Sequence, residues 1–417
     1  MDYEGRFLGA AEDIGRLGFV LEAEGQRFLF DYGLAPDRPP LYPIEAPPVD
    51  QMFLTHAHLD HSGMVPWLAG RQEGSILTTR PTADVSTLMH KDSLKIARQE
   101  GFPEPYDDRD IEATQGLYEC IRFGQTVGAG RFEATLHSAG HIPGAAQVEL
   151  RGERTVVFTG DLFTRPQRLV GPGKPVRCDV LCMETTYAGR EHEDRHDIER
   201  AFIDHCDDVA HRGGVTVAAA FAVGRAQELA MVLADQGLEV WMDGMARRVS
   251  QIYGENAEFL RDAQAYQRAM GQTKHVYHQK GRDVALRDAD VIITTSGMLE
   301  GGPILYYIDQ IRNDPKSSVA LTGYQVRGTN GRRLLDDATI DLDPHADPGK
   351  RVHKVQCEVR HFDFSAHAGH SDLVDFAEST GAEDIVLFHG DHREALVPDL
   401  EVFADVHLPE RGVPFKV

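Results

Sequence analysis

Four residues that can bind a metal ion lie in one short run, Thr-His-Ala-His-Leu-Asp-His, which begins at residue 55. Apolar residues 52–54 precede the run and predict a strand. Side chains at positions i and i+2 of an extended segment point to the same face, so His56 and His58 can bind one cation. Asp60 and His61 fall on the following turn, where they can reach a second ion. Imidazoles and carboxylates are ligands that suit zinc.

Four other ligand-type residues stand at strand ends or in tight turns elsewhere in the chain. Each of them alone is more often an ordinary structural residue. Together they complete the set that the first run begins, because a two-metal site needs ligands from several segments and a carboxylate can bridge two cations. Asp31 ends a predicted strand and is expected to orient a ligand through a hydrogen bond. The other three are His141 in Gly-His-Ile-Pro-Gly, Asp161 in Thr-Gly-Asp and His389 in Phe-His-Gly-Asp.

The pattern of predicted elements changes twice along the chain. Short strands dominate the first part, for example at residues 19–22 and 27–31. From about residue 194 helices and strands alternate, as in helix 225–233, which predicts a parallel α/β unit. After residue 357 the earlier style resumes with strand 385–388. The chain is therefore predicted to be one domain interrupted by another, divided as 1–190, 191–355 and 356–417.

Composition excludes several classes of protein. The chain has 417 residues, of which 41% are apolar and 26% charged, so it is neither disordered nor a disulfide-stabilised miniprotein. No apolar run approaches the roughly 20 residues of a membrane span, and the first residues do not resemble a signal peptide. The five cysteines form no Cys-x-x-Cys pair, so a thiolate zinc site is not indicated. A soluble, cytoplasmic protein with no membrane partner is expected.

The charge balance is strongly acidic. The chain holds 66 Asp and Glu against 43 Lys and Arg, only nine of them Lys, for a net charge of −23. Such a surface keeps a protein soluble in concentrated salt, so the composition favours a halophilic protein over an ordinary acidic cytosolic one. The net charge argues against long-range attraction to nucleic acid and leaves room for a local basic groove.

The histidine run, with the later Gly-His, Thr-Gly-Asp and His-Gly-Asp elements, resembles the metallo-β-lactamase superfamily. This resemblance implies an α/β fold, an αββα sandwich with metal ions at one edge of its sheets. Three motifs resemble the nucleic-acid-processing branch: Glu184-Thr-Thr-Tyr is similar to motif A, Phe-Ser-Ala-His367 to motif B, and His389 to motif C. The segment between Glu184 and His367 then resembles the inserted β-CASP domain, a Rossmann-like parallel α/β domain.

Within that segment, residues 220–228, 296–303 and 323–332 resemble further signatures of the β-CASP ribonucleases. The similarity is greatest to the branch of the cleavage and polyadenylation specificity factor endonuclease subunit, in particular to archaeal homologues that lack KH domains. Two positions depart from the family pattern. Where the family usually reads His-Ala-Asp after motif B, this chain reads His367-Ala-Gly-His370 before Ser-Asp372, and Asp391 replaces the Glu that usually follows motif C.

The resemblance implies two zinc ions per chain. One would be held by His56, His58, His141 and Asp161, and the other by Asp60, His61, Asp161 and His389. It also implies that Asp60 helps to orient the attacking water, that His367 is the general acid and that Glu184 holds His367 in its charged form.

RNA contacts are expected from glycine-rich turns of the insert. Arg225 and Arg332 each follow a glycine, where a helix or loop start can face a phosphate. Tyr324 can stack on a base. Ser296, Gln325 and Thr329 offer neutral hydrogen-bond donors. The alternative interpretation is that these turns only reverse the chain in an α/β domain.

Three classes of function are compatible with these residues. The favoured one is a zinc-dependent ribonuclease of RNA 3′-end processing or decay, acting on single-stranded RNA as an endonuclease or, alternatively, as a 5′–3′ exonuclease. A hydrolase of DNA or of a small ester is disfavoured by His389 and by the long insert. A non-catalytic subunit would have lost ligands, and none is missing. A homodimer and partner proteins of an RNA-processing complex stay open.

We expect RNA cleavage to persist in molar KCl, because binding through metal ions and a few arginines depends only weakly on counterion release. A nuclease that makes six to ten phosphate contacts loses about 10³–10⁵-fold in affinity between about 50 and 200 mM salt. Initial rates across a KCl series test this expectation. Activity that peaks at low salt and vanishes in molar KCl would refute the salt adaptation without touching the site assignment.

Overall fold

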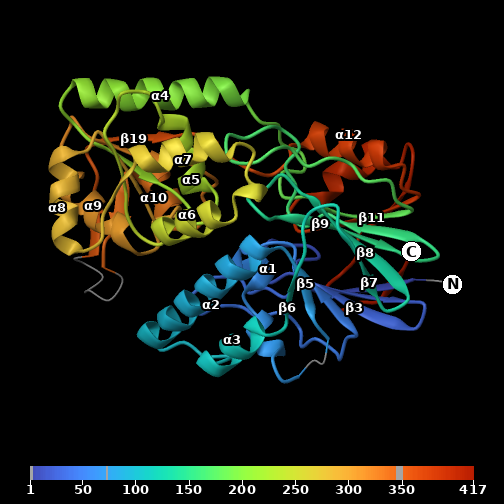
Figure 1. Ribbon diagram of the computed structural model, residues 1–417. Helices are drawn as coiled ribbons and strands as arrows, with labels where there is room; N and C mark the ends of the chain where they lie inside the picture. The colour runs from blue at the N-terminus through green and yellow to red at the C-terminus, as the bar shows by residue number, and fades with distance from the viewer. Residues whose placement is uncertain (1–2, 72–73, 344–350) are drawn as a thin grey trace. The chain divides into compact units, whose positions relative to one another are not determined.

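The computed structural model describes residues 3–71, 74–343 and 351–417, which form two compact units (Figure 1). Unit 1 comprises Met1–Pro166, Val170–Glu191 and Ala366–Val417. Unit 2 comprises Gln167–Leu169 and His192–Ser365. No helix within the described ranges is long and apolar enough to cross a membrane.

Unit 1 contains two seven-stranded mixed sheets. The first has the order β22 (Phe415–Lys416), β1 (Glu4–Gly9), β2 (Gly18–Ala23), β3 (Gln26–Phe30), β4 (Gln51–Phe53), β5 (Ile76–Thr78), β6 (Tyr118–Cys120). The second has the order β21 (Asp405–His407), β20 (Asp384–Phe388), β11 (Val180–Glu184), β10 (Thr155–Phe158), β9 (Ala146–Arg151), β8 (Phe132–Ser138), β7 (Thr126–Ala129). The helices are α1 (Leu59–Ser62), η1 (Val65–Leu68), α2 (Arg80–Glu100), α3 (Asp108–Gln115), α12 (His370–Thr380), η3 (Arg393–Leu396) and α13 (Val397–Leu400).

The two sheets pack face to face through aromatic side chains. The ring centroids of Phe19 and Phe158 are 5.8 Å apart, and those of Phe7 and Phe388 are 5.3 Å apart. Because side chains alternate along a strand, the neighbouring apolar residues cover the outer faces. The outer face of the first sheet packs against α2 and α3, and that of the second against α12 and α13 (Figure 1). The predicted αββα sandwich is confirmed.

This arrangement explains why distant ligand-type residues meet. Strands β3, β4, β5 and β6 run parallel in the first sheet, and β10, β11, β20 and β21 run parallel in the second. The carboxyl ends of parallel strands lie at the same edge of a sheet, so the segments that follow them are brought together there. β3 ends at Phe30, one residue earlier than predicted, because Asp31 leaves the extended conformation with φ 57°.

Unit 2 is built on one six-stranded parallel sheet. Its order is β14 (Lys274–His275), β13 (Val240–Met242), β15 (Val291–Thr294), β12 (Thr216–Ala219), β16 (Ser318–Leu321), β19 (Glu358–His361). Its other elements are α4 (Arg195–His211), α5 (Arg225–Leu233), α6 (Ala246–Glu255), η2 (Ala257–Phe259), α7 (Ala263–Gln272), α8 (Gln279–Asp288), α9 (Pro303–Ile311), α10 (Asn330–Asp337) and the hairpin β17 (Thr339–Asp341)–β18 (Val352–Lys354).

Helices cover both faces of this sheet. Ala218 of β12 packs with residues of α4 and α5, whereas its neighbour Val217 packs with residues of α8 and α9. The predicted parallel α/β insert is therefore confirmed. The predicted boundary at residues 355 and 356 lies just before β19, which pairs with β16, so the compact unit extends to Ser365.

Candidate metal centre

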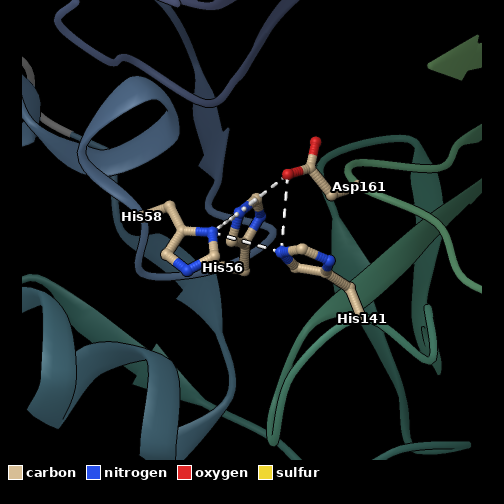
Figure 2. A group of neighbouring side chains, drawn as sticks. All are labelled: His56, His58, His141 and Asp161. Carbon is tan, nitrogen blue, oxygen red and sulfur yellow. Dashed lines mark hydrogen bonds and ion pairs between the residues drawn. The ribbon is translucent and has the colours of Figure 1, made fainter. Parts of the chain in front are cut away.

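Four side chains of unit 1 converge with their nitrogen and oxygen atoms facing one another (Figure 2). His58 Nδ1 lies 3.2 Å from His56 Nε2 and 3.1 Å from His141 Nε2. An oxygen of Asp161 lies 3.3 Å from His56 Nε2 and 3.5 Å from His141 Nε2. The two sheets supply this group jointly, since His56 and His58 follow β4 while His141 and Asp161 follow β8 and β10.

Hydrogen bonds behind these rings determine which nitrogen faces the centre as a lone pair. His141 Nδ1 donates to the carbonyl of Ala366 at 2.8 Å, so its Nε2 is unprotonated in the neutral ring. The hydroxyl of Thr55 donates to Asp31 at 2.7 Å and therefore accepts from His56 Nδ1 at 3.1 Å. Lone pairs on His56 and His141 thus point at the same small volume, as in sites that bind a cation.

Asp31 holds His61 in the same way, as predicted for a residue that orients a ligand. Asp31 accepts hydrogen bonds from His61 Nδ1 at 2.7 Å and from the Thr55 backbone N–H at 2.8 Å. The opposite nitrogen, His61 Nε2, lies 3.0 Å from an oxygen of Asp161. Both atoms are buried and neither makes a hydrogen bond in the described part of the chain. A lone pair and a carboxylate oxygen this close need a proton or a metal ion between them.

A second group comprises Asp60, His61 and His389. His389 Nε2 lies 3.5 Å from an oxygen of Asp60 and is another buried atom that makes no hydrogen bond with the described residues. Its Nδ1 contacts the hydroxyl of Thr186 at 3.3 Å and lies 3.6 Å from Asp161. His389 follows β20 directly and adopts a left-handed backbone, φ 56°, which turns its ring toward this group.

The protonation states suit metal binding. Burial, assisted by the neighbouring charge of His61, lowers the pKa of His56 to about 3, and burial likewise lowers the pKa of His141 well below its usual value. Burial alone would raise the pKa of Asp161, but the charges of His61 and His56 outweigh it and hold that pKa well below its usual range. Neutral imidazoles and an ionised carboxylate are the forms that bind divalent cations.

Glu184 and His367 form a third group with Asp161. His367 Nδ1 donates to Glu184 at 2.9 Å, and its Nε2 faces Asp161 at 3.8 Å. Glu184 is fully buried and also accepts from the backbone N–H groups of Leu162 and Thr186, each at 2.9 Å. Burial lowers the pKa of His367, but the charges of Glu184 and Asp161 reverse this and raise it to about 9.

Helix α2 and its N-cap residue Thr79 hold two of the ligand loops through residues that were not predicted from the sequence. The hydroxyls of Thr79 and Thr82 both donate to the carbonyl of Gly144, at 2.8 and 3.1 Å, beside the loop that carries His141. His90 donates to the carbonyl of Ser62 at 2.8 Å, at the end of the turn that carries Asp60 and His61. A polar residue on the buried side of a helix was the only sequence signal for these contacts.

The two departures from the family pattern lie outside the three groups. His370, the first residue of α12, accepts from the Gly189 backbone N–H at 3.0 Å and contacts Asp399 at 3.0 Å. Asp391 is exposed. Tyr187, another residue not predicted, stacks on His367 with ring centroids 6.1 Å apart.

The six residues predicted to contact RNA all lie in unit 2, beyond the carboxyl ends of β12, β15 and β16: Arg225, Ser296, Tyr324, Gln325, Thr329 and Arg332. They are therefore not among the residues that form the three groups of unit 1. Tyr324 is 40% exposed, whereas Gln325 is buried and donates to the carbonyls of Gly297 and Gly323.

Most of the remaining members already have partners. Arg225 donates to the carbonyl of Thr322, and Arg332 pairs with Asp336 at 2.8 Å. Thr329 caps α10 by accepting from the Arg332 backbone N–H, and Ser296 accepts from the Glu300 backbone N–H at 3.1 Å. These contacts hold the turns in shape.

The raised pKa of His61 leads to a pH prediction for protein stripped of metal by a chelator. Burial opposes the charge on His61, but Asp161 and Asp31 raise its pKa well above the usual value. The unfolded chain releases this proton near pH 6.5. The stabilisation is therefore complete below that pH and is lost as pH rises through the folded pKa, by about 1.4 kcal/mol per pH unit.

Urea unfolding of the metal-free protein between about pH 6.5 and 9 tests this. We expect the slope of the free energy of unfolding against pH to be less steep in His61→Gln by about 1.4 kcal/mol per unit. The titration of His367 contributes equally to the slopes of both proteins and cancels in their difference. Equal slopes in the two proteins would contradict the assignment.

Three family descriptions match successive parts of the chain. Residues 15–202 match the metallo-beta-lactamase superfamily, residues 226–334 the Beta-Casp domain, and residues 352–397 the Zn-dependent metallo-hydrolase RNA specificity domain. The first of these implies divalent-metal binding, for which the His and Asp groups of unit 1 have the required atoms. A protein of unknown function from Enterococcus faecalis V583 has a similar crystal structure, with a TM-score of 0.62 and 15% identity over 100% of both chains.

Among proteins of known name, the chain is 32% identical to Probable RNase MJ4 of Methanocaldococcus jannaschii, over 94% of each chain. It is 31% identical to RNase aCSPSF2 of Saccharolobus solfataricus, over 99% of this chain and 85% of that protein. It is 30% identical to Transcription termination factor FttA of Methanothermobacter thermautotrophicus, over 93% of this chain and 67% of that protein. The chain therefore belongs to the β-CASP ribonuclease family of the metallo-β-lactamase superfamily.

Proposed function

We propose that the protein is a zinc-dependent ribonuclease that hydrolyses phosphodiester bonds within single-stranded RNA. The observation that carries the proposal is the position of Asp161, whose carboxylate belongs to the first and third groups of unit 1 and lies 3.0 Å from His61 of the second. One oxygen of Asp161 lies near His56, His141 and His367, and the other lies near His61 and His389. This arrangement supports a proposal in which a nucleophile-activating metal site and an acid lie next to each other, as phosphodiester hydrolysis requires.

Two zinc ions are proposed, one held by His56, His58, His141 and Asp161 and the other by Asp60, His61, Asp161 and His389. When bound, they would supply an acidified water and positive charge opposite the phosphate oxygens. The chain prepares their sites through Asp31, Thr55 and the Ala366 carbonyl, which fix the orientation of His61, His56 and His141. Asp60 also offers an acceptor that can orient the attacking water.

His367 is proposed as the general acid. Its Nδ1 hydrogen is held by Glu184 at 2.9 Å, so the proton available for transfer is on Nε2. That proton passes to the 3′-oxygen that leaves when the phosphodiester bond breaks. Glu184 is a positioning residue, since it is fully buried and acts through His367.

RNA as substrate is supported by the matched RNA specificity domain and by the names of the relatives, two called RNases and one a transcription termination factor. We therefore propose a role in RNA 3′-end formation or decay. In unit 2, Tyr324 is proposed to stack on a base and Arg225 to face a phosphate, with Ser296, Gln325, Thr329 and Arg332 shaping the turns around them. A homodimer and RNA-processing partners stay predictions.

The first test uses single-stranded RNA labelled at the 5′ or 3′ end, with zinc and high KCl. Wild type should release internal fragments from both labels. We expect His367→Ala to lower the rate about 10²–10⁴-fold, the usual contribution of a general acid, and Asp161→Ala to abolish cleavage together with zinc binding. His370→Ala is the matched control, because His370 lies three residues away and its side chain hydrogen-bonds to Gly189 and Asp399, outside the three groups.

Each other outcome has a distinct meaning. Mononucleotides released only from 5′-monophosphate ends would replace the endonuclease with a 5′–3′ exonuclease. Zinc-loaded wild type that cleaves no RNA would favour the non-catalytic subunit. Unchanged cleavage by His367→Ala would remove His367 from the chemistry.

The alkaline limb of the pH–rate profile tests the role of Glu184. A general acid must be protonated, so activity should fall as pH rises through the pKa of His367, about 9. Glu184→Gln removes the largest contribution that raises this pKa and should move the limb to lower pH. An unchanged limb would show that another group donates the proton. Zinc content measured on each variant separates this effect from loss of metal.

A further inference from the structure

One segment of unit 2 has a charge opposite to that of the chain. Residues 245–282 hold seven Lys and Arg against three Asp and Glu, whereas the whole chain carries −23. None of the residues proposed above for catalysis or RNA contact lies in this segment. Its cations are therefore not explained by the function proposed so far.

The fold gathers part of this segment at one edge of the sheet. Strands β13 and β14 run parallel, with Met242 opposite His275, so the segments after them emerge side by side. Arg247, at the start of α6, places its guanidinium 4.6 Å from the centre of the Tyr277 ring. The ring of His275 lies 6.2 Å from that of Tyr277. In open α/β sheets this carboxyl edge is the usual place for ligands.

Tyr277 is unusually exposed for an aromatic residue. It is 74% exposed, against 40% for Tyr324 and 38% for Phe221, the other exposed large aromatic side chains of the described residues. With Arg247 stacked on it, the ring keeps a large accessible surface. A cation behind an exposed aromatic ring is a platform on which a nucleic-acid base can stack.

Three cations of this segment lack a carboxylate partner among the described residues. Arg247, Arg248 and Lys280 have no carboxylate within 4.0 Å among the described residues, whereas Lys274 and Arg282 pair with Glu239 and Asp243, each at 2.7 Å. Arg248 donates only to the neutral amide of Gln251. Arg247 Nε and His275 Nδ1 are also buried without a hydrogen bond in the part of the chain described.

We propose that Arg247, Arg248, His275, Tyr277 and Lys280, the stacking patch, bind an unpaired stretch of RNA. Tyr277 stacks on a base, and the three cations face the flanking phosphates. The inference rests on the proposed function for the choice of RNA. An acidic peptide would be attracted by the cations but would leave the exposed ring without a stacking partner, and paired bases present no free face to it.

The test measures the dissociation constant of a fluorescent phosphorothioate-substituted RNA of about 16 nucleotides for the zinc-loaded full chain. We expect Tyr277→Ala to weaken binding about fivefold or more, and Tyr277→Phe to retain most of it. Arg247→Gln should reduce the slope of log affinity against log salt by about 0.7. Arg200→Gln is the matched charge control, because Arg200 is an exposed arginine of α4 outside the segment. Hydrolysis of bis(4-nitrophenyl) phosphate by each variant reports the metal centre separately.

Unchanged RNA affinity of Tyr277→Ala and Arg247→Gln, with normal binding by wild type, would overturn the stacking patch and leave the ribonuclease proposal intact. Displacement of RNA by polyglutamate that does not depend on Tyr277 would also overturn it, in favour of an acidic protein partner. Tyr277-dependent RNA binding by a protein that hydrolyses neither RNA nor the small diester would support the patch and refute the proposed ribonuclease.

Discussion

The three ligand groups of unit 1 depend on one electrostatic constraint: buried nitrogen and oxygen atoms with lone pairs face one another. Imidazole nitrogens of His56, His61 and His141 lie within 3.5 Å of the oxygens of Asp161, with almost no exposed surface. Such atoms repel one another in a medium of low dielectric constant unless a cation or a proton lies between them. The surrounding structure therefore holds these atoms in an arrangement that is electrostatically favourable only when positive charge lies between them.

The surrounding structure meets this constraint with rigid elements. The aromatic core between the sheets holds β3, β4, β10 and β20 in register, and their carboxyl ends deliver ligand-type residues to one edge. Asp31 and His389, which directly follow β3 and β20, adopt left-handed backbone conformations. Such conformations cost energy in residues other than glycine and persist where the surrounding contacts fix the backbone. Helix α2 adds hydrogen bonds to two of the ligand loops.

The two units differ in what they contribute. Every residue of the proposed chemistry belongs to unit 1, whereas the residues proposed to contact RNA belong to unit 2. Unit 2 uses the carboxyl edge of a parallel sheet, where helix starts and glycine turns leave backbone donors available. The net negative charge of the chain repels phosphate groups. Cations without a carboxylate partner are therefore the groups that can attract the phosphates of RNA.

The sequence by itself determined the fold class and the alternation of the insert, because both depend on motif order and periodicity that a linear pattern preserves. The metal-ligand set that the family resemblance implies stays a prediction. The sequence also indicated Asp31 and Glu184 as supporting carboxylates and paired Glu184 with His367, but it gave no partner for Asp31. Thr79, Thr82, His90 and Tyr187 could not be recognised, since a lone polar or aromatic residue on a buried face has many uses. Only the tertiary structure decided that Gln325 is buried and that Arg247 meets Tyr277, because contacts between residues far apart in the chain depend on how strands pair and helices pack.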